Sequence, residues 1–252
     1  MIAKARAFAH RRPELVVLLA FALTALTLLI IFKLGSEVME GDTKAFDIAV
    51  LTRLRHATEG DAPWKAALRA VMLDVTALGD NATLVIVVAM AAGFLMLSQQ
   101  HRLGILLVAA SASGGLVTTA LKLTFDRPRP DVVAHLTSFG TASFPSGHAM
   151  NSAVIYLTLA GLVARAVPTL RLRVYTLCCA VALTLSIGLS RLYLGVHWST
   201  DVLAGWIAGA GWAVLWWSIA WWFERSQLAL HTSGKTPALD GQGRDGSEHH
   251  SL

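Results

Sequence analysis

The run LVVLLAFALTALTLLIIF occupies residues 15–32 and contains no charged side chain. An apolar stretch of roughly 18 residues is long enough to cross the hydrocarbon core of a membrane as an α-helix. The basic residues before it superficially resemble the start of a secretory signal. The run is too long for the apolar part of such a signal, however, and no convincing small-residue cleavage site precedes Ser36. We therefore predict a retained transmembrane helix.

Five further apolar runs follow along the chain, at residues 82–98, 103–121, 149–164, 174–189 and 202–223. The chain has 252 residues, of which 55% are hydrophobic and 15% charged, and charge is roughly 25% in soluble globular proteins. This composition excludes a soluble domain and a disordered chain. The predicted fold is an all-α polytopic membrane bundle of about six transmembrane helices, with both termini on the same side.

The segment at 35–81 is more polar, and six apolar residues in it recur at helical spacing: Trp64, Leu68, Val71, Met72, Val75 and Leu78. This stripe predicts an amphipathic helix on the membrane surface. A weaker stripe is formed by Phe46, Val50 and Leu54. The alternative is a small helical hairpin that caps the bundle.

The net charge of +5 does not indicate a nucleic-acid partner, because the basic residues are scattered between apolar runs without a binding motif. Four of them precede the first span: Lys4, Arg6, Arg11 and Arg12. This cluster favours a cytoplasmic N-terminus, although the count of basic residues over all loops does not decide the orientation. Small-residue pairs at Gly114 and Thr118 and at Gly205 and Gly209 indicate helix packing within the bundle, and a homodimer is compatible with them but not required.

Three short polar segments are the hardest to explain by structure alone: KLTFDRPRP at 122–130, PSGH at 145–148 and SRLYLGVHWSTD at 190–201. They lie at the end of the third span, at the start of the fourth, and between the fifth and the sixth. Because successive spans alternate in direction, all three segments are expected at the same membrane face. They bring cations, histidines and a carboxylate to one place.

The cations predict a phosphate ligand. Lys122, Arg129 and Arg191 are strong donors to phosphate oxygens, and a cluster of cations at a membrane surface is costly without an anion. Ser146 and Gly147 precede a helix, so their hydroxyl and backbone N–H groups can add donors to the same oxygens.

The spacing of His197 and Asp201 lets the carboxylate accept a hydrogen bond from one ring nitrogen and leave the other nitrogen basic, which suits nucleophilic catalysis. His148 is a second imidazole, placed to give a proton to a leaving oxygen. Which histidine is the nucleophile is not decided by this pattern. The carboxylates form no cluster that suits magnesium, and cations around the histidines disfavour a metal, so we expect no metal and no cofactor.

Each of these residues has a simpler explanation when taken alone. A single lysine or arginine here could anchor a helix end among lipid headgroups, and Ser146 or Asp201 could cap a helix. For Arg127, headgroup contact and substrate contact stay equally open. The combination of the three segments is what favours a site.

The three segments resemble the signature of the type 2 phosphatidic acid phosphatase superfamily, K-x6-R-P, P-S-G-H and S-R-x5-H-x3-D, in order and with the spacings intact. The resemblance covers residues 80–223 in detail and departs at no catalytic position. It implies a metal-independent membrane phosphatase of lipid phosphates, bacterial in type, with its active site at the outer face. It further implies that His197 forms a phosphohistidine, that Asp201 supports it and that His148 protonates the leaving group. The phosphate-binding residues would be Lys122, Arg129, Ser146, Gly147 and Arg191.

The resemblance divides the chain into a cytoplasmic N-terminus with the first span at 1–34, an outer amphipathic linker at 35–81, a five-helix catalytic core at 82–223 and a disordered cytoplasmic tail at 224–252. The protein is expected in the inner cell membrane with both termini cytoplasmic. Among lipid phosphate substrates, undecaprenyl pyrophosphate is the first choice and phosphatidylglycerophosphate the second, and the loop at 131–144 and the helix near Trp64 are expected to shape lipid entry. The alternatives are a lipid phosphotransferase with the same chemistry and, in another class, a lipid or anion transporter.

Overall fold

Residues 13–60, 62–137 and 140–233 are described by the structure, a computed structural model, and every regular element in them is a helix. The helices are α2 (Pro13–Glu40), α3 (Lys44–Thr58), α4 (Pro63–Ala77), α5 (Asn81–Leu97), α6 (His101–Phe125), α7 (Gly147–Ala166), α8 (Leu170–Tyr193) and α9 (Ser199–Ser233). The prediction of an all-α fold is confirmed. The basic cluster that favoured a cytoplasmic N-terminus lies outside the described residues.

The expected membrane spans are present as helices. By length and apolar content, α2, α6, α7, α8 and α9 could each cross a membrane, and α4 and α5 pass the same test as a pair bent by 51°. The described helices thus offer five candidate spans, or six if that pair counts as one, and α5 lies at the place of the second predicted span. Large apolar side chains of α5, such as Val85, Met90 and Phe94, are exposed, as expected of a helix that faces lipid.

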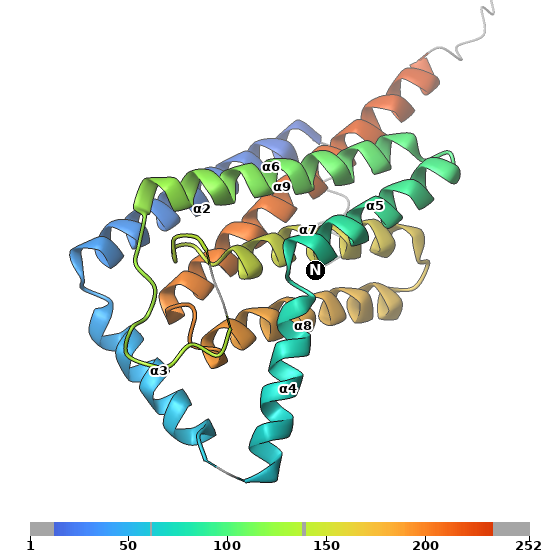
Figure 1. Cartoon of the computed structure of the whole chain (residues 1–252). Coiled ribbons are helices and arrows are strands. Elements are labelled where there is room, and N and C mark those ends of the chain that lie inside the picture. Colours follow the sequence, from blue (N-terminus) through green and yellow to red (C-terminus); the bar gives the residue numbers. More distant parts are fainter. Residues whose placement is uncertain (1–12, 61, 138–139, 234–252) are drawn as a thin grey trace, which may run out of the picture.

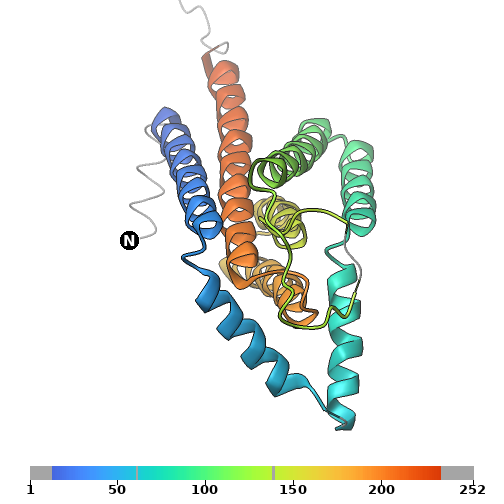
Figure 2. The same ribbon diagram turned by 60° about the vertical axis from the view of Figure 1, so that its left-hand side comes forward.

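Helix α7 lies at the centre of the bundle and packs against α5, α6, α8 and α9 (Figures 1 and 2). Its contact with α9 is close because two glycines of α9 face its backbone. A Cβ atom on Gly205 would lie 2.8 Å from the carbonyl oxygen of Ser146, and one on Gly209 would lie 2.5 Å from that of Met150. The expected role of these glycines in packing within the bundle is confirmed.

Helices α2 and α9 lie side by side and run in opposite directions, so the described chain begins and ends at the same end of the bundle (Figures 1 and 2). We expected α9 to end at Phe223, but it continues to Ser233. The sequence contains neither glycine nor proline between Phe223 and Gly234, so nothing in it stops the helix earlier. The rest of the expected disordered tail lies outside the described residues.

At the other end of the bundle, α3 and α4 form a V whose tip points away from the spans (Figure 2). The residues of the amphipathic stripe predicted for α4 do not all face the same surroundings. Leu68 and Met72 pack against a buried cluster that includes Tyr193 and Leu194, whereas Trp64 is exposed. Helix α4 therefore both caps the end of α8 and presents an apolar edge outward.

Helix α3 packs on the bundle through a face that overlaps only partly with the apolar stripe predicted for it. Phe46 is 59% exposed, and the buried residues of α3 are Asp47 and Leu51, with Leu54 packed beside them. The inward face is turned by about one residue because the carboxylate of Asp47 is drawn into a hydrogen-bonded site beneath the helix, which is described below.

The α7–α9 contact gives a stability prediction. In Gly209→Ala the added methyl group must push α9 away from the α7 backbone, and overpacking of this kind typically costs about 1–3 kcal/mol. We expect a lower melting temperature for the purified protein in detergent. Gly93→Ala is the control, since a Cβ atom there meets nothing within 4 Å. Equal melting temperatures for the two variants would contradict this description of the contact.

Candidate active site

A cavity of about 500 Å³ lies at the end of the bundle where α3 and α4 attach. It brings the three polar segments of the sequence together. Six of the eight predicted site residues line it: Lys122, Arg129, Gly147, His148, Arg191 and His197. The other two, Ser146 and Asp201, are completely buried and do not line the cavity.

His197 is placed by the tight turn between α8 and α9. Gly195 in this turn has φ of +74°, a conformation that suits glycine. A Cβ atom on Gly195 would also lie only 3.0 Å from the carbonyl oxygen of Ala134 and 2.9 Å from Val133. The turn therefore needs glycine both for its backbone angle and for its contact with the loop before α7.

The predicted pairing of His197 with Asp201 is present. Nδ1 of the imidazole lies 3.4 Å from Oδ2 of Asp201, and the opposite nitrogen, Nε2, lies 3.3 Å from the guanidinium of Arg129. If the proton sits on Nδ1, as its carboxylate partner favours, the lone pair of Nε2 is directed to the cation side of the cavity.

Burial lowers the pKa of His197 from 6.5 to about 3, and the nearby carboxylate of Asp201 opposes this effect. Burial also lowers the pKa of Arg129. The imidazole is therefore neutral at physiological pH, and one of its nitrogens is free to act as a nucleophile or an acceptor.

Asp201 is held by four donors besides the histidine contact. Its Oδ2 accepts from the backbone N–H of Trp198 at 2.8 Å and from the hydroxyl of Ser143, and its Oδ1 accepts from Arg127 at 2.5 Å. Its backbone carbonyl accepts from the N–H of Ser146 at 2.9 Å, which ties α9 directly to the start of α7.

The three predicted phosphate-binding cations point to the cavity with different partners. Lys122 donates to the carbonyl of Ala142, and Arg129 donates to the carbonyl of Val196 at 2.7 Å. Arg191 donates to the hydroxyl of Thr76 at 2.8 Å, and its buried Nε has no partner among the described atoms. Most of these partners are neutral, so the cations keep capacity for an anion.

Two predicted residues differ from expectation. His148 pairs through Nε2 with Oδ1 of Asp80 at 2.8 Å, a carboxylate at the start of α5 that the sequence did not single out. The hydroxyl of Ser146 is buried without a described partner, so it does not contact the cavity in this arrangement. Gly147 and His148, which follow Ser146 at the start of α7, do line the cavity.

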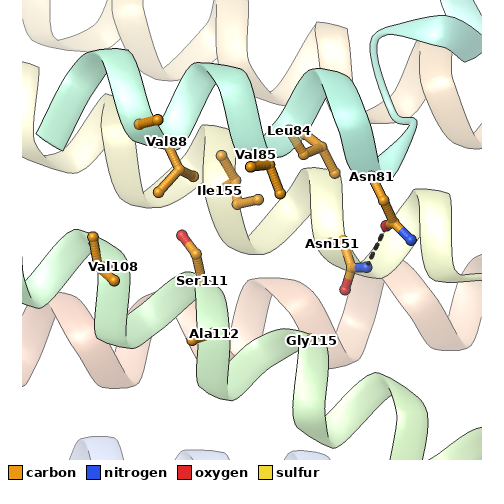
Figure 3. A pocket seen from close by; sticks show the side chains of 11 residues that line it. Asn81, Leu84, Val85, Val88, Val108, Ser111, Ala112, Gly115, Asn151 and Ile155 are labelled. Carbon is orange, nitrogen blue, oxygen red and sulfur yellow. Dashed lines mark hydrogen bonds between the residues drawn. The ribbon is translucent and has the colours of Figure 1, made fainter. Parts of the chain in front are cut away.

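A second cavity of about 410 Å³ adjoins the first between α5, α6 and α7, and it is almost wholly apolar. Figure 3 shows Leu84, Val85 and Val88 of α5 facing Val108 and Ala112 of α6 across it.

The residues that line both cavities are Asn81, Gly115 and Asn151. A polar, cation-lined chamber thus continues into an apolar groove between two membrane helices.

Comparisons with known proteins agree with this geometry. The family description "PAP2 superfamily" matches residues 103–225. Phosphatidylglycerophosphatase B of Bacillus subtilis strain 168 is 34% identical over 152 residues, which are 58% of this chain and 71% of that protein. This chain belongs to the PAP2 superfamily.

Solved structures of PAP2 enzymes extend the match to the fold. The transmembrane PAP2-type phosphatidylglycerolphosphate phosphatase from Bacillus subtilis aligns with a TM-score of 0.69 at 27% identity, over 80% of this chain and 96% of that chain. Aquifex aeolicus LpxE aligns with a TM-score of 0.50 at 22% identity, over 68% of this chain and 94% of that one, which is a likeness of fold alone. The protein is thus a multi-pass membrane PAP2 enzyme, a phosphatase of lipid phosphates.

The sequence patterns did not reveal three polar residues of this PAP2 site, and they left the role of a fourth undecided. Asp80 and Ser143 were not singled out, and neither was Asp47, whose carboxylate accepts from Arg127 at 2.8 Å. Arg127 itself, for which headgroup and substrate contact were left open, is buried and bridges Asp47 and Asp201. The helical register of Asp47 with Leu51 and Leu54 was the signal that could have revealed its inward position.

The lowered pKa of His197 predicts a pH effect on stability. The unfolded chain binds a proton at this histidine below pH 6.5, and the folded chain does so only near pH 3. The free energy of unfolding should therefore fall as the pH decreases through this window, by up to about 1.4 kcal/mol per pH unit. His197→Asn removes this contribution, so its melting temperature should vary less with pH than that of the wild type.

His56→Asn is the control, because His56 is an exposed histidine of α3 and its replacement should leave the slope unchanged. The same slope for the wild type and His197→Asn would show that this imidazole is not kept neutral by burial.

Proposed function

We propose that this protein removes the terminal phosphate of a glycerophospholipid, with phosphatidylglycerophosphate as the first candidate substrate, through a covalent phosphohistidine at His197. The observation that carries the proposal is the junction of the cation-lined cavity with the apolar groove between α5 and α6. A phosphate fits the first and a hydrocarbon chain fits the second, so the junction suits a molecule that has both.

The groove bears on how the lipid reaches the site. We expected the loop at 131–144 and the helix near Trp64 to shape entry. The apolar groove instead favours lateral access from the bilayer between α5 and α6, with the polar side chains of Asn81 and Asn151 (Figure 3) where the groove meets the cation-lined cavity.

The choice of phosphatidylglycerophosphate rests on the similarity to Bacillus subtilis phosphatidylglycerophosphatase, whose name carries this activity. No described residue favours an isoprenoid chain over an acyl chain. Undecaprenyl pyrophosphate therefore stays a prediction, and the assay below includes it.

The surroundings of the two histidines support His197 as the nucleophile. His197 is held by Asp201 and Ser143 on one side and has Nε2 beside Arg129, where a bound phosphoryl group would be stabilised. His148 lines the same cavity and is paired with Asp80, so it suits proton transfer to the leaving oxygen.

In the proposed reaction, Nε2 of His197 attacks phosphorus and the bond from phosphorus to the lipid oxygen breaks. His148 gives its proton to that oxygen, and the lipid alcohol leaves. Asp201 stabilises the positive charge on the phosphorylated imidazole. Water then attacks the phosphohistidine, His148 takes the proton of that water, and inorganic phosphate leaves with Nε2 restored.

Lys122, Arg129 and Arg191 bind the phosphoryl oxygens and stabilise the negative charge that they carry in the transition state. The N–H groups of Gly147 and His148 at the start of α7 add donors of the kind found at helix N-termini. The buried hydroxyl of Ser146 would join them only after a rotation of its side chain.

We further propose that the cavity end of the bundle faces the outer side of the inner membrane, with the division of the chain into first span, outer linker, catalytic core and cytoplasmic tail as expected from the sequence. The basic segment before the first span supports this orientation.

Phosphate release without an added acceptor would separate the hydrolase from a phosphotransferase, and any release would exclude a transporter without chemistry.

The test is phosphate release by purified protein from phosphatidylglycerophosphate, phosphatidic acid, undecaprenyl pyrophosphate and soluble nitrophenyl phosphate, in excess EDTA. EDTA is included because protein cations, not a metal, are proposed to neutralise the phosphoryl oxygens. We expect activity on every substrate, highest on phosphatidylglycerophosphate. Loss of activity in EDTA with recovery on added magnesium would contradict the proposed chemistry.

The groove adds a matched pair of variants to this assay. Ala112→Phe fills the apolar cavity and should raise KM for the lipid substrates while leaving nitrophenyl phosphate hydrolysis unchanged. Leu116→Phe is the control, since Leu116 is 72% exposed on the same helix and does not line the groove. A lipid KM that does not change in Ala112→Phe would remove the groove from the proposal.

The two histidines should differ in their dependence on the leaving group. His197→Ala removes the covalent route, so activity should collapse on lipid monoester and nitrophenyl phosphate alike. His148→Ala should cause a large loss of activity on the lipid monoester and a smaller loss on nitrophenyl phosphate, because the leaving group of nitrophenyl phosphate needs no proton. General acid assistance is typically worth about 100-fold to 10,000-fold, so the difference should be measurable.

Both variants are first checked for folding and membrane insertion. Rescue of His197→Ala alone by nitrophenyl phosphate would reverse the two assignments, and equal losses in all four assays would refute the division of roles.

A further inference from the structure

Asp47 of α3 is a completely buried carboxylate that the proposed chemistry does not use. It lies on the first-loop helix, 80 positions before Arg127 and about 150 before the start of α9, and it does not line the cavity. A buried charge of this kind is costly unless it is paired and hydrogen-bonded, so its surroundings show what it holds in place.

One oxygen of Asp47 binds the first turn of α9. Oδ1 accepts from the hydroxyl of Ser199 at 2.5 Å and from the backbone N–H of Thr200 at 2.9 Å. The free N–H groups at a helix start are usually satisfied by a side chain of the same segment. Here α3 supplies the acceptor, so this carboxylate fixes the turn that carries Asp201.

The other oxygen of Asp47 binds Arg127. Oδ2 accepts from the guanidinium nitrogen NH2 at 2.8 Å and from the hydroxyl of Thr200 at 2.7 Å. The second nitrogen of the same guanidinium, NH1, donates to Oδ1 of Asp201 at 2.5 Å. Arg127 is thereby shared between two carboxylates, and it also lies over the ring of Trp198 at 5.2 Å.

This sharing controls how Asp201 faces His197. An arginine and a carboxylate pair most strongly when two nitrogens meet both oxygens. With NH2 occupied by Asp47, Arg127 takes only Oδ1 of Asp201, and Oδ2 remains directed to His197. Without Asp47, the guanidinium could turn and take both oxygens of Asp201, which would draw Oδ2 away from the imidazole.

We propose that Asp47 is a positioning residue for the PAP2 reaction: by occupying Arg127 and fixing the start of α9, it keeps Asp201 aligned with His197. The helix of the first loop is then part of the catalytic support as well as a cap on the bundle. This inference rests on the proposed role of His197.

The test compares Asp47→Asn with the wild type on nitrophenyl phosphate and on phosphatidylglycerophosphate. The amide keeps the volume of the side chain and one acceptor oxygen, but it loses the charge that holds Arg127. We expect kcat to fall by roughly tenfold to a hundredfold, as misalignment of a catalytic group by about 1 Å does, with KM and the inhibition constant of inorganic phosphate unchanged. Asp42→Asn, an exposed carboxylate before α3, should leave all three values unchanged.

A double-mutant cycle tests the route through Arg127. In an Arg127→Gln background, Asp47→Asn should lower kcat little further, because the link is already lost. Additive losses would overturn the proposal, and so would a loss of activity that only follows the folded fraction or that raises KM and the phosphate inhibition constant together.

If Asp47→Asn does not fold, Thr200→Val serves instead, because it keeps both charges and nearly the same volume while removing the hydroxyl that donates to Asp47 and accepts from Arg127. It should lower kcat in the same direction with KM unchanged, and an unaltered kcat would count against the proposal. A wild type without phosphatase activity, or an active His197→Ala, would instead refute the proposed function and leave the geometry around Asp47 as it is.

Discussion

The site depends on the hydrogen bonds of one buried carboxylate. Asp201 accepts from Trp198, Ser143 and Arg127 and contacts His197. These partners come from the α8–α9 turn and from the loop between α6 and α7. Its carbonyl holds the start of α7 as well. A carboxylate can be kept ionised away from water only when its oxygens are fully hydrogen-bonded. Moving any one of these segments would therefore leave the buried carboxylate without a partner and destabilise the whole arrangement.

The helix packing makes this convergence possible. Gly205 and Gly209 let α9 approach the backbone of α7, which brings the His148 end of α7 beside the His197 turn. The V of α3 and α4 then closes the same end from outside: Asp47 comes from one arm, and Thr76, the partner of Arg191, comes from the other. The polar chamber therefore lies at the end of helices such as α5 and α6, whose outer surfaces carry exposed apolar side chains.

Much of this arrangement follows from the sequence. The apolar runs predicted the spans, four of them to within about four residues at each end, because a membrane helix must satisfy its backbone internally and has a length set by the bilayer. The three polar segments predicted the lining of the cavity, because alternating spans return every second loop to the same face. The spacing of His197 and Asp201 predicted their contact.

What the sequence did not predict are contacts between residues far apart in the chain. Nothing local to Asp47 reveals that Arg127 lies beneath α3. The stripe of Phe46, Val50 and Leu54 was chosen by hydrophobicity alone, whereas the inward face of α3 includes the buried charge of Asp47. In the same way, Asp80 is an ordinary residue before a helix until the fold brings it to His148. The apolar groove also depends on how α5 and α6 diverge, which no local pattern encodes.

The most direct measurement is to quench the protein during turnover of phosphatidylglycerophosphate and to map the phosphorylated residue by mass spectrometry under alkaline conditions that preserve phosphohistidine. We predict one phosphoryl group on the peptide that contains His197, absent in His197→Ala and accumulated in His148→Ala if His148 assists its hydrolysis. Phosphate on the peptide that contains His148, or turnover by His197→Ala at the wild-type rate, would contradict the assignment of His197 as the nucleophile held by Asp201.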